Sequence, residues 1–201
     1  MPTDQDRRAR AILKLNKILK QGHIPCRFFK PYSLSTTHIA NCFIHSVYNL
    51  SEKQLKSLNS LEMDEIKMHI HHKNAHNQKA INESIFSVIK ESGLQVEQVD
   101  KCYPCAKNQW IVAYYLSVRK DSLKSGAKKE FEDYHFMLRE KNGYWSEKLG
   151  PLQNVNKYTQ PPLTIDRYSH IYQLQGFYLI TNPYTDKQRN NKLLQEEEYE
   201  R

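Results

Sequence analysis

The spacing of hydrophobic positions changes near the middle of the chain, from helical in the first half to strand-like in the second. Residues 78–92 repeat apolar side chains every three or four positions, and Gly93 follows where a glycine commonly ends a helix. Further on, runs rich in β-branched and aromatic residues predict strands. These predicted strands are 110–118, 134–140, 144–148 and 172–180. Helices followed by antiparallel strands predict an α+β fold.

Both ends of the chain differ in character from the region between them. Residues 1–30 predict a basic amphipathic helix with a lead-in, and we expect this helix to pack on the domain. Its apolar positions are Ile12, Leu13, Leu15, Ile18 and Leu19. Residues 31–183 hold the predicted α+β domain. Residues 184–201 are a polar, Glu-rich tail, which we expect to be either disordered or a loosely attached helix.

The 201 residues carry a formal net charge of +8, spread along the chain rather than gathered in one block. We expect no nucleic-acid partner, because no nucleic-acid-binding motif accompanies the charge. No apolar run is long enough for a transmembrane helix, and the first residues lack the apolar segment of a secretory signal. We therefore expect a protein that is cytoplasmic as made and keeps its thiols reduced.

Cysteines and histidines are the residues that could hold a metal. Cys102 and Cys105 form a lone CxxC without the second pair that a structural zinc site needs, so we expect loop cysteines. The clustered histidines are His69, His71, His72 and His76. On a helix three of them would share a face, but no Glu stands between them in the HExxH manner and carboxylate or Cys partners are missing. We predict no metal and no cofactor, with this histidine cluster as the open alternative.

Cys42 and His135 have the setting of a nucleophile and its base. Cys42 lies near the start of a helix predicted over 41–50, where a helix terminus favours the thiolate. Its backbone N–H would be one oxyanion donor, with Thr37 or Asn41 supplying the second. His135 begins a predicted strand in the later half of the chain, so the pair would meet in space rather than in sequence.

Three short elements carry a resemblance to a known family. They are Asn41-Cys42-Phe43-Ile44-His45, Asp133-Tyr134-His135-Phe136 and Gly143-Tyr144-Trp145-Ser146-Glu147-Lys148. Together they resemble papain-like cysteine peptidases or amidases found among small bacterial and phage proteins, over residues 36–180. The resemblance implies a papain-like fold, with N-terminal helices packed on an antiparallel sheet. It also implies a hydrolase that works through a Cys–His pair and a thioester acyl-enzyme.

The third member of the site is open among three residues. Glu147 stands where the family pattern has His, and a three-residue hairpin loop with a bulge would pair Met137 with Glu147. Glu147 would then share a face with His135 and could orient its ring, as in CHAP-type amidases. Asn154 would give the Cys-His-Asn set of papain, and Asp166 is the remaining alternative.

These observations predict a cysteine hydrolase of peptidase, amidase or deamidase type that acts on a protein or peptide. The Glu-rich end, residues 195–201, resembles the translocation signals of type IV secretion effectors, which implies release into a host cell without a signal peptide. The alternative is a non-catalytic module on the same fold that binds an acidic partner or surface through its basic face. Its cues are the net charge and Glu147 in place of His. The oligomeric state stays open.

Overall fold

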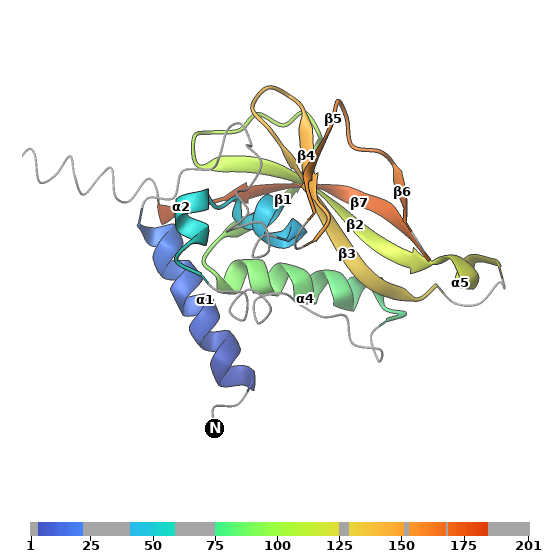
Figure 1. The fold of residues 1–201 in the computed structure, drawn as a ribbon, viewed down its shortest axis with the longest axis horizontal. Helices are drawn as coiled ribbons and strands as arrows, with labels where there is room; N and C mark the ends of the chain where they lie inside the picture. The colour runs from blue at the N-terminus through green and yellow to red at the C-terminus, as the bar shows by residue number, and fades with distance from the viewer. Residues whose placement is uncertain are drawn as a thin grey trace, which may run out of the picture.

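The computed structural model describes residues 4–21, 41–58, 75–124, 129–150, 153–167 and 169–184. Within these ranges the chain forms an antiparallel sheet of seven strands with helices against one side (Figure 1). The strand order is β1-β7-β2-β3-β4-β5, and β6 pairs with β7. The strands are β1 (Gln95–Val99), β2 (Gln109–Arg119), β3 (Phe131–Arg139), β4 (Trp145–Lys148), β5 (Val155–Tyr158), β6 (Thr164–Arg167) and β7 (His170–Thr181). The fold is α+β, as the sequence predicts.

The helices of the described ranges come mainly from the first half of the chain. They are α1 (Asp4–Lys20), the π-helix η1 (Phe43–Tyr48), α2 (Glu52–Leu55), α4 (Gln78–Glu91) and α5 (Lys120–Lys124). Asn77 caps α4, because its side chain accepts a hydrogen bond from the Ala80 N–H at 3.0 Å. Gly93 follows α4 with a φ of +89°, a conformation that favours glycine. This boundary agrees with the predicted one.

The larger core fills the space between the helices and one face of the sheet. Alternate side chains of β2 point into it, because successive residues of a strand face opposite sides. These side chains are Trp110, Val112, Tyr114, Leu116 and Val118. Leu15 and Leu19 of α1 belong to the same core and are fully buried. The N-terminal helix therefore packs on the domain as expected, although Leu13, predicted on its apolar face, is 69% exposed.

The opposite face of the sheet carries a smaller core, and β4, β5 and β6 rise on that side (Figure 1). Its buried members are Ile111, Ala113, Tyr115, Met137, Trp145, Ile165 and Leu179. His135 belongs to this face, because its neighbours Tyr134 and Phe136 point into the larger core. The candidate catalytic histidine thus lies on the side of the sheet that α4 does not cover.

Several elements differ from the prediction. β1, β5 and β6 lie in segments that we did not predict as strands. β5 and β6 have four residues each and are mostly exposed, so their alternation is too short to stand out. The helix predicted over 41–50 is a six-residue π-helix that ends at Asn49, whose φ is 48°.

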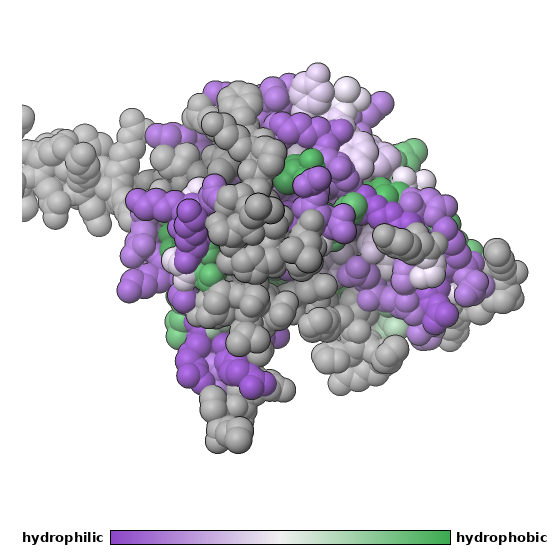
Figure 2. Space-filling view, viewed as in Figure 1, coloured by the Kyte–Doolittle hydropathy of each residue, from purple (hydrophilic) through white to green (hydrophobic). Residues whose placement is uncertain are grey.

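The described residues on the face shown in Figure 2 are largely polar. Apolar residues gather there only in small separate patches. None of the described helices has the length and apolar character needed to cross a membrane.

Candidate functional site

His135 is fixed within β3, where it is 3% exposed. Its strand partner is Tyr115 on β2, whose ring centroid lies 6.3 Å from the imidazole. Tyr172 of β7 approaches the imidazole edge-on, with centroids 5.9 Å apart. The Tyr172 hydroxyl donates a hydrogen bond to Asp133 Oδ2 at 2.9 Å. The imidazole is therefore held between two aromatic rings, and Asp133 serves Tyr172 rather than the ring.

Cys42 lies in the first turn of the helical segment that continues as η1, and it is 8% exposed. Asn41 shapes this turn. Its Oδ1 accepts a hydrogen bond from the Ile44 N–H at 2.9 Å, and its carbonyl accepts one from the His45 N–H at 2.9 Å. Cys42 thus lies near a helix start as predicted, in a turn held by the residue before it.

Hydrogen bonds from Ser46 attach η1 to the sheet. The Ser46 hydroxyl donates to the Phe136 carbonyl at 3.0 Å, and the Ser46 carbonyl accepts from Trp110 Nε1 at 3.0 Å. Because β4 pairs with β3 only from Met137 onward, the Phe136 carbonyl is open to a side chain. π-Helical turns are rare and often occur at functional sites. Here the attachment brings the start of η1, with Cys42, to the edge of β3.

Cys42 lies beside the His135 ring, and its side chain is one of the groups that raise the pKa of the ring. Glu147 occupies Nε2 of that ring, so Nδ1 is the nitrogen available to the sulfur. Burial by itself lowers the pKa of His135, but the interactions with Cys42 and Glu147 outweigh it and raise the pKa to about 9. His135 is therefore positively charged at neutral pH.

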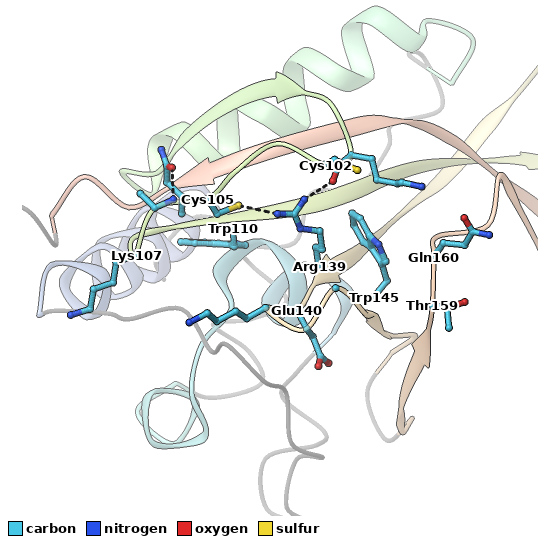
Figure 3. Close-up of a pocket in the computed structure, with 14 residues that line it drawn as sticks. Cys102, Cys105, Lys107, Trp110, Arg139, Glu140, Trp145, Thr159 and Gln160 are labelled. Atoms are coloured by element: carbon cyan, nitrogen blue, oxygen red, sulfur yellow. Dashed lines mark hydrogen bonds between the residues drawn. The ribbon is translucent and has the colours of Figure 1, made fainter.

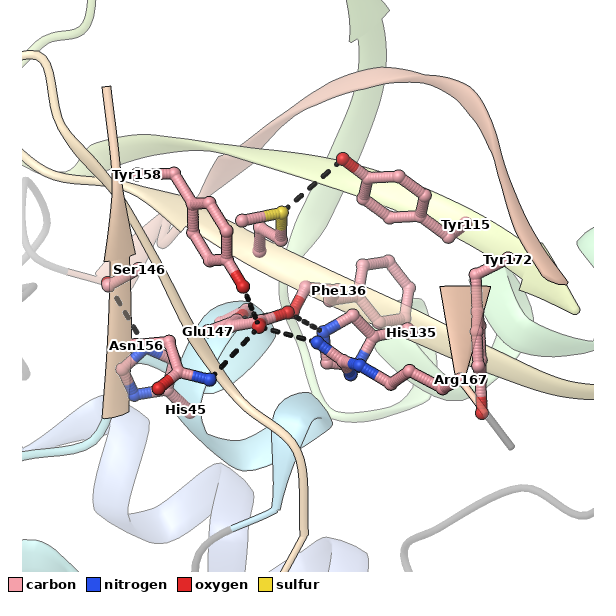
Figure 4. A network of polar contacts seen from close by, with 12 residues as sticks. His45, Tyr115, His135, Phe136, Ser146, Glu147, Asn156, Tyr158, Arg167 and Tyr172 are labelled. Carbon is pink, nitrogen blue, oxygen red and sulfur yellow. Dashed lines mark hydrogen bonds and ion pairs between the residues drawn. The ribbon is translucent and has the colours of Figure 1, made fainter. Parts of the chain in front are cut away.

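Glu147 is fully buried, and its Oε2 accepts a hydrogen bond from His135 Nε2 at 2.8 Å. Its Oε1 accepts from three donors: the Tyr158 hydroxyl and Arg167 Nη2, each at 2.6 Å, and Asn156 Nδ2 at 3.3 Å (Figure 4). Burial raises the pKa of Glu147, but His135 and the donors around Oε1 lower it to about 2. Glu147 is therefore an ionised carboxylate, and the donors that contact it favour its charged form.

The β3–β4 hairpin places Glu147 as the sequence predicts. Its tight loop includes Gly143, whose φ of +87° suits the bulge position of a three-residue hairpin loop. Met137 pairs with Glu147 across the ladder. Because residues two apart in a strand share a face, His135 and Glu147 become diagonal neighbours.

Asn154 and Asp166, the other two alternatives for the third member, are not brought to the His135 ring. Both residues are exposed. Asp166 instead forms a salt bridge with Lys120 at 2.5 Å, with 69% of its side chain exposed. A buried Nε2–H needs a buried acceptor, which Glu147 already supplies. The sequence-based alternatives therefore reduce to Glu147 in the structure.

Arg167, Tyr158 and Asn156 belong to the site, and the sequence analysis missed them. They come from β5 and β6, the two short strands without a clear pattern. Asn156 pairs with Glu147 across the β4–β5 ladder. Arg167 follows Asp166 directly, and alternation along a strand sends their side chains to opposite sides. A correct prediction of β6 would have placed Arg167 on the inward face of the strand and Asp166 on the outward face.

Two further basic side chains are buried in β4 and η1. His45 Nε2 lies 3.2 Å from Ser146 Oγ, and burial lowers the His45 pKa to about 3, so this ring is neutral. Lys148 Nζ donates to the carbonyls of Gly150 and Gln153 at 2.6 and 2.8 Å. Burial lowers the Lys148 pKa to about 8. Both side chains hold the strand that carries the carboxylate of the site.

Several residues of the sequence-based predictions lie outside the described ranges: Thr37, His69, His71, His72 and the tail from 185 to 201. Asn41, the other predicted oxyanion donor, lies beside Cys42 and uses its Oδ1 for the turn. Cys102 and Cys105 are exposed loop cysteines with free thiols, as expected. Within the described ranges no group of three or more His, Cys, Asp and Glu side chains could hold a metal ion.

No family model, curated protein or solved structure matches this chain. The proposed function therefore rests on the geometry of the site. The imidazolium of His135 and the ionised carboxylate of Glu147 share a hydrogen bond, their backbones lie on neighbouring strands, and Cys42 lies beside the same ring. Such a set can attack a carbonyl carbon and pass a proton to a leaving group.

Proposed function

We propose that this protein is a papain-like cysteine hydrolase that cleaves an amide bond of a protein or peptide. The observation that carries the proposal is the 2.8 Å contact between His135 Nε2 and Glu147 Oε2, on a ring that also has Cys42 beside it. Cys42 is the nucleophile, His135 transfers protons, and Glu147 holds the ring in one orientation and tautomer.

The reaction starts from the Cys42 thiolate and the His135 imidazolium. The thiolate attacks the substrate carbonyl carbon, and an electron pair moves onto the carbonyl oxygen. The backbone N–H of Cys42 donates to this oxyanion, with Thr37 or Asn41 as the second donor. When the oxyanion collapses, the C–N bond breaks and His135 gives its proton to the leaving amine. His135 then takes a proton from water, whose oxygen attacks the thioester and releases the acid.

Alkylation by iodoacetamide, followed by peptide mass spectrometry, tests the activated thiol. Cys42 is 8% exposed whereas Cys102 and Cys105 are exposed, so access alone would make Cys42 the slower thiol. We expect Cys42 to react faster than Cys26, Cys102 and Cys105 at pH 6, and to lose this advantage in His135→Ala. If Cys42 alkylates no faster than the other three cysteines, the proposal fails.

The alternative, a non-catalytic interaction module, predicts that the sulfur does nothing. Cys42→Ala separates the two functions in any assay of biological effect, since a module would keep its effect and a hydrolase would lose it. Translocation as a secreted effector rests on residues 195–201, outside the described ranges, and stays a prediction.

A further inference from the structure

A separate hollow of about 700 Å³ opens at the end of the sheet where β3 turns into β4. Its walls come from the loop between β1 and β2, the β3–β4 hairpin and the segment after β5. Both tryptophans of the chain, Trp110 and Trp145, line it. The volume lies in the range of ligand-binding pockets. We call this cavity the Arg139 hollow, after the residue that organises it.

Arg139 fixes the loop that forms one wall of the hollow. Its Nη1 donates to the Lys101 carbonyl at 2.5 Å, and its Nη2 donates to the Tyr103 carbonyl at 2.9 Å and to Cys105 Sγ at 3.6 Å. Figure 3 shows the guanidinium reaching from β3 to the loop with Cys102 and Cys105. All these partners of Arg139 are neutral acceptors, so its positive charge is held in place and not neutralised.

Three lysines add to this charge. Lys101 and Lys107 lie on the loop, Lys141 lies on the hairpin, and all three are exposed. None of them forms an ion pair with a carboxylate among the described residues. Burial raises the pKa of the Cys105 thiol, so no thiolate there offsets the cations. Glu140, the carboxylate in the wall, is paired with Lys157 at 3.2 Å. The walls of the hollow therefore carry four basic side chains, Lys101, Lys107, Arg139 and Lys141, against one paired carboxylate.

We propose that the Arg139 hollow binds an acidic peptide segment, with Asp or Glu carboxylates meeting Lys101, Lys107 and Lys141. A single phosphate group is disfavoured as the ligand. The planar Arg139 guanidinium could bind a phosphate, but its donors are already directed at loop carbonyls. Separate lysines are point charges that suit several carboxylates spread along an extended chain. Tyr103 and Tyr144, from the same loop and hairpin, are 41% and 47% exposed and offer ring faces to such a chain.

The hollow does not depend on the proposed hydrolase, because none of its residues belongs to the Cys42 site. Arg139 follows His135 by four positions on β3, about 13 Å along the strand. An extended peptide of about four residues spans that distance. A protein substrate held in the hollow could therefore reach the site, and a mere binding partner could use the hollow alone.

Tryptophan fluorescence of the full chain reports on the hollow directly, because both indoles line it. The probes are an octaglutamate peptide, an octaglutamine peptide and inorganic phosphate. We expect octaglutamate to change the emission with an affinity that falls as salt rises, and octaglutamine to have no effect. Phosphate binding more tightly than octaglutamate would overturn the peptide assignment in favour of a phosphate ligand.

Charge reversal supplies the matched test. Lys101→Glu with Lys141→Glu should weaken octaglutamate binding about tenfold or more. Lys79→Glu with Lys90→Glu on α4 changes the net charge equally, away from the hollow, and should weaken it less than about twofold. Equal losses of octaglutamate affinity in both double variants would show that binding depends only on net charge, and the proposal would fail. Cys42→Ala should bind octaglutamate with wild-type affinity. The peptide-binding proposal and the hydrolase proposal can therefore fail independently of each other.

Discussion

His135 Nε2 lies 2.8 Å from Glu147 Oε2, although the two residues are not opposite each other in the β3–β4 ladder. Glu147 is opposite Met137, and the contact runs diagonally to the residue two positions earlier. The carboxylate can make this contact while buried because Arg167, Tyr158 and Asn156 satisfy its other oxygen. The position of the Glu147 carboxylate thus depends on residues of β3, β5 and β6.

Glu147→Gln tests the role of this carboxylate. The change keeps the shape of the side chain and removes its charge, so we expect the pKa of His135 to fall from about 9. The alkylation rate of Cys42 near neutral pH should also fall, once the His135 pKa drops below the pH of the assay and the ring loses its charge. NMR titration of the His135 ring and the alkylation assay measure the two effects. Glu132→Gln is the control, because Glu132 contacts another histidine, His170, at 2.6 Å.

The pH dependence of stability follows from His135. Its pKa is raised from 6.5 to about 9, so its contribution is fully present below pH 6.5 and is lost as pH rises through 9. This shift corresponds to about 3 kcal/mol. Lys148 has the opposite effect. Its pKa is lowered to about 8, so its contribution to the free energy of unfolding rises as pH increases above 8 and the amine loses its charge. Urea unfolding of wild type and His135→Gln at pH 6 and pH 10 isolates the histidine, because both proteins carry Lys148. A difference in stability that does not shrink at pH 10 would contradict the assignment.

Arg167→Met tests the support behind Glu147. The Arg167 guanidinium is the charged donor to Oε1, at 2.6 Å with 18% of the side chain exposed. Its loss should cost about 2 kcal/mol of folding free energy, because a buried carboxylate loses a charged donor. It should also raise the pKa of Glu147 from about 2. Lys120→Met breaks the exposed pair with Asp166 and should cost less than about 1 kcal/mol. Equal costs in chemical denaturation would contradict the assigned role of Arg167.

Asn41 can be tested as a cap separately from its predicted role as an oxyanion donor. Its Oδ1 accepts the Ile44 N–H, so Asn41→Ala should cost about 1 kcal/mol in thermal or chemical unfolding. Asn41→Asp keeps an acceptor oxygen and should retain most of that stability. If the Asp variant is as unstable as the Ala variant, the capping hydrogen bond is not what holds the turn before Cys42.

The helix over α4 and the strands β2, β3, β4 and β7 were predictable because each has a long or clear local pattern. The hairpin register was also predictable, since a loop length and one glycine determine which residues pair. That register alone selects Glu147 as a neighbour of His135. The sequence therefore contained the histidine–carboxylate pair of the candidate site, together with the order of Cys42 before His135.

What the tertiary structure decided lies in short segments and in charges from distant parts of the chain. β5 and β6 are too short for their alternation to stand out, so Asn156, Tyr158 and Arg167 could not be assigned to Glu147 from the sequence. The attachment of η1 to β3 includes a hydrogen bond from the Ser46 hydroxyl to the Phe136 carbonyl, across 90 residues of chain. The Arg139 hollow gathers lysines from a loop and a hairpin in the same way. Periodicity reports which side of an element is buried, whereas a site depends on which elements meet, and that is settled by packing over the whole fold.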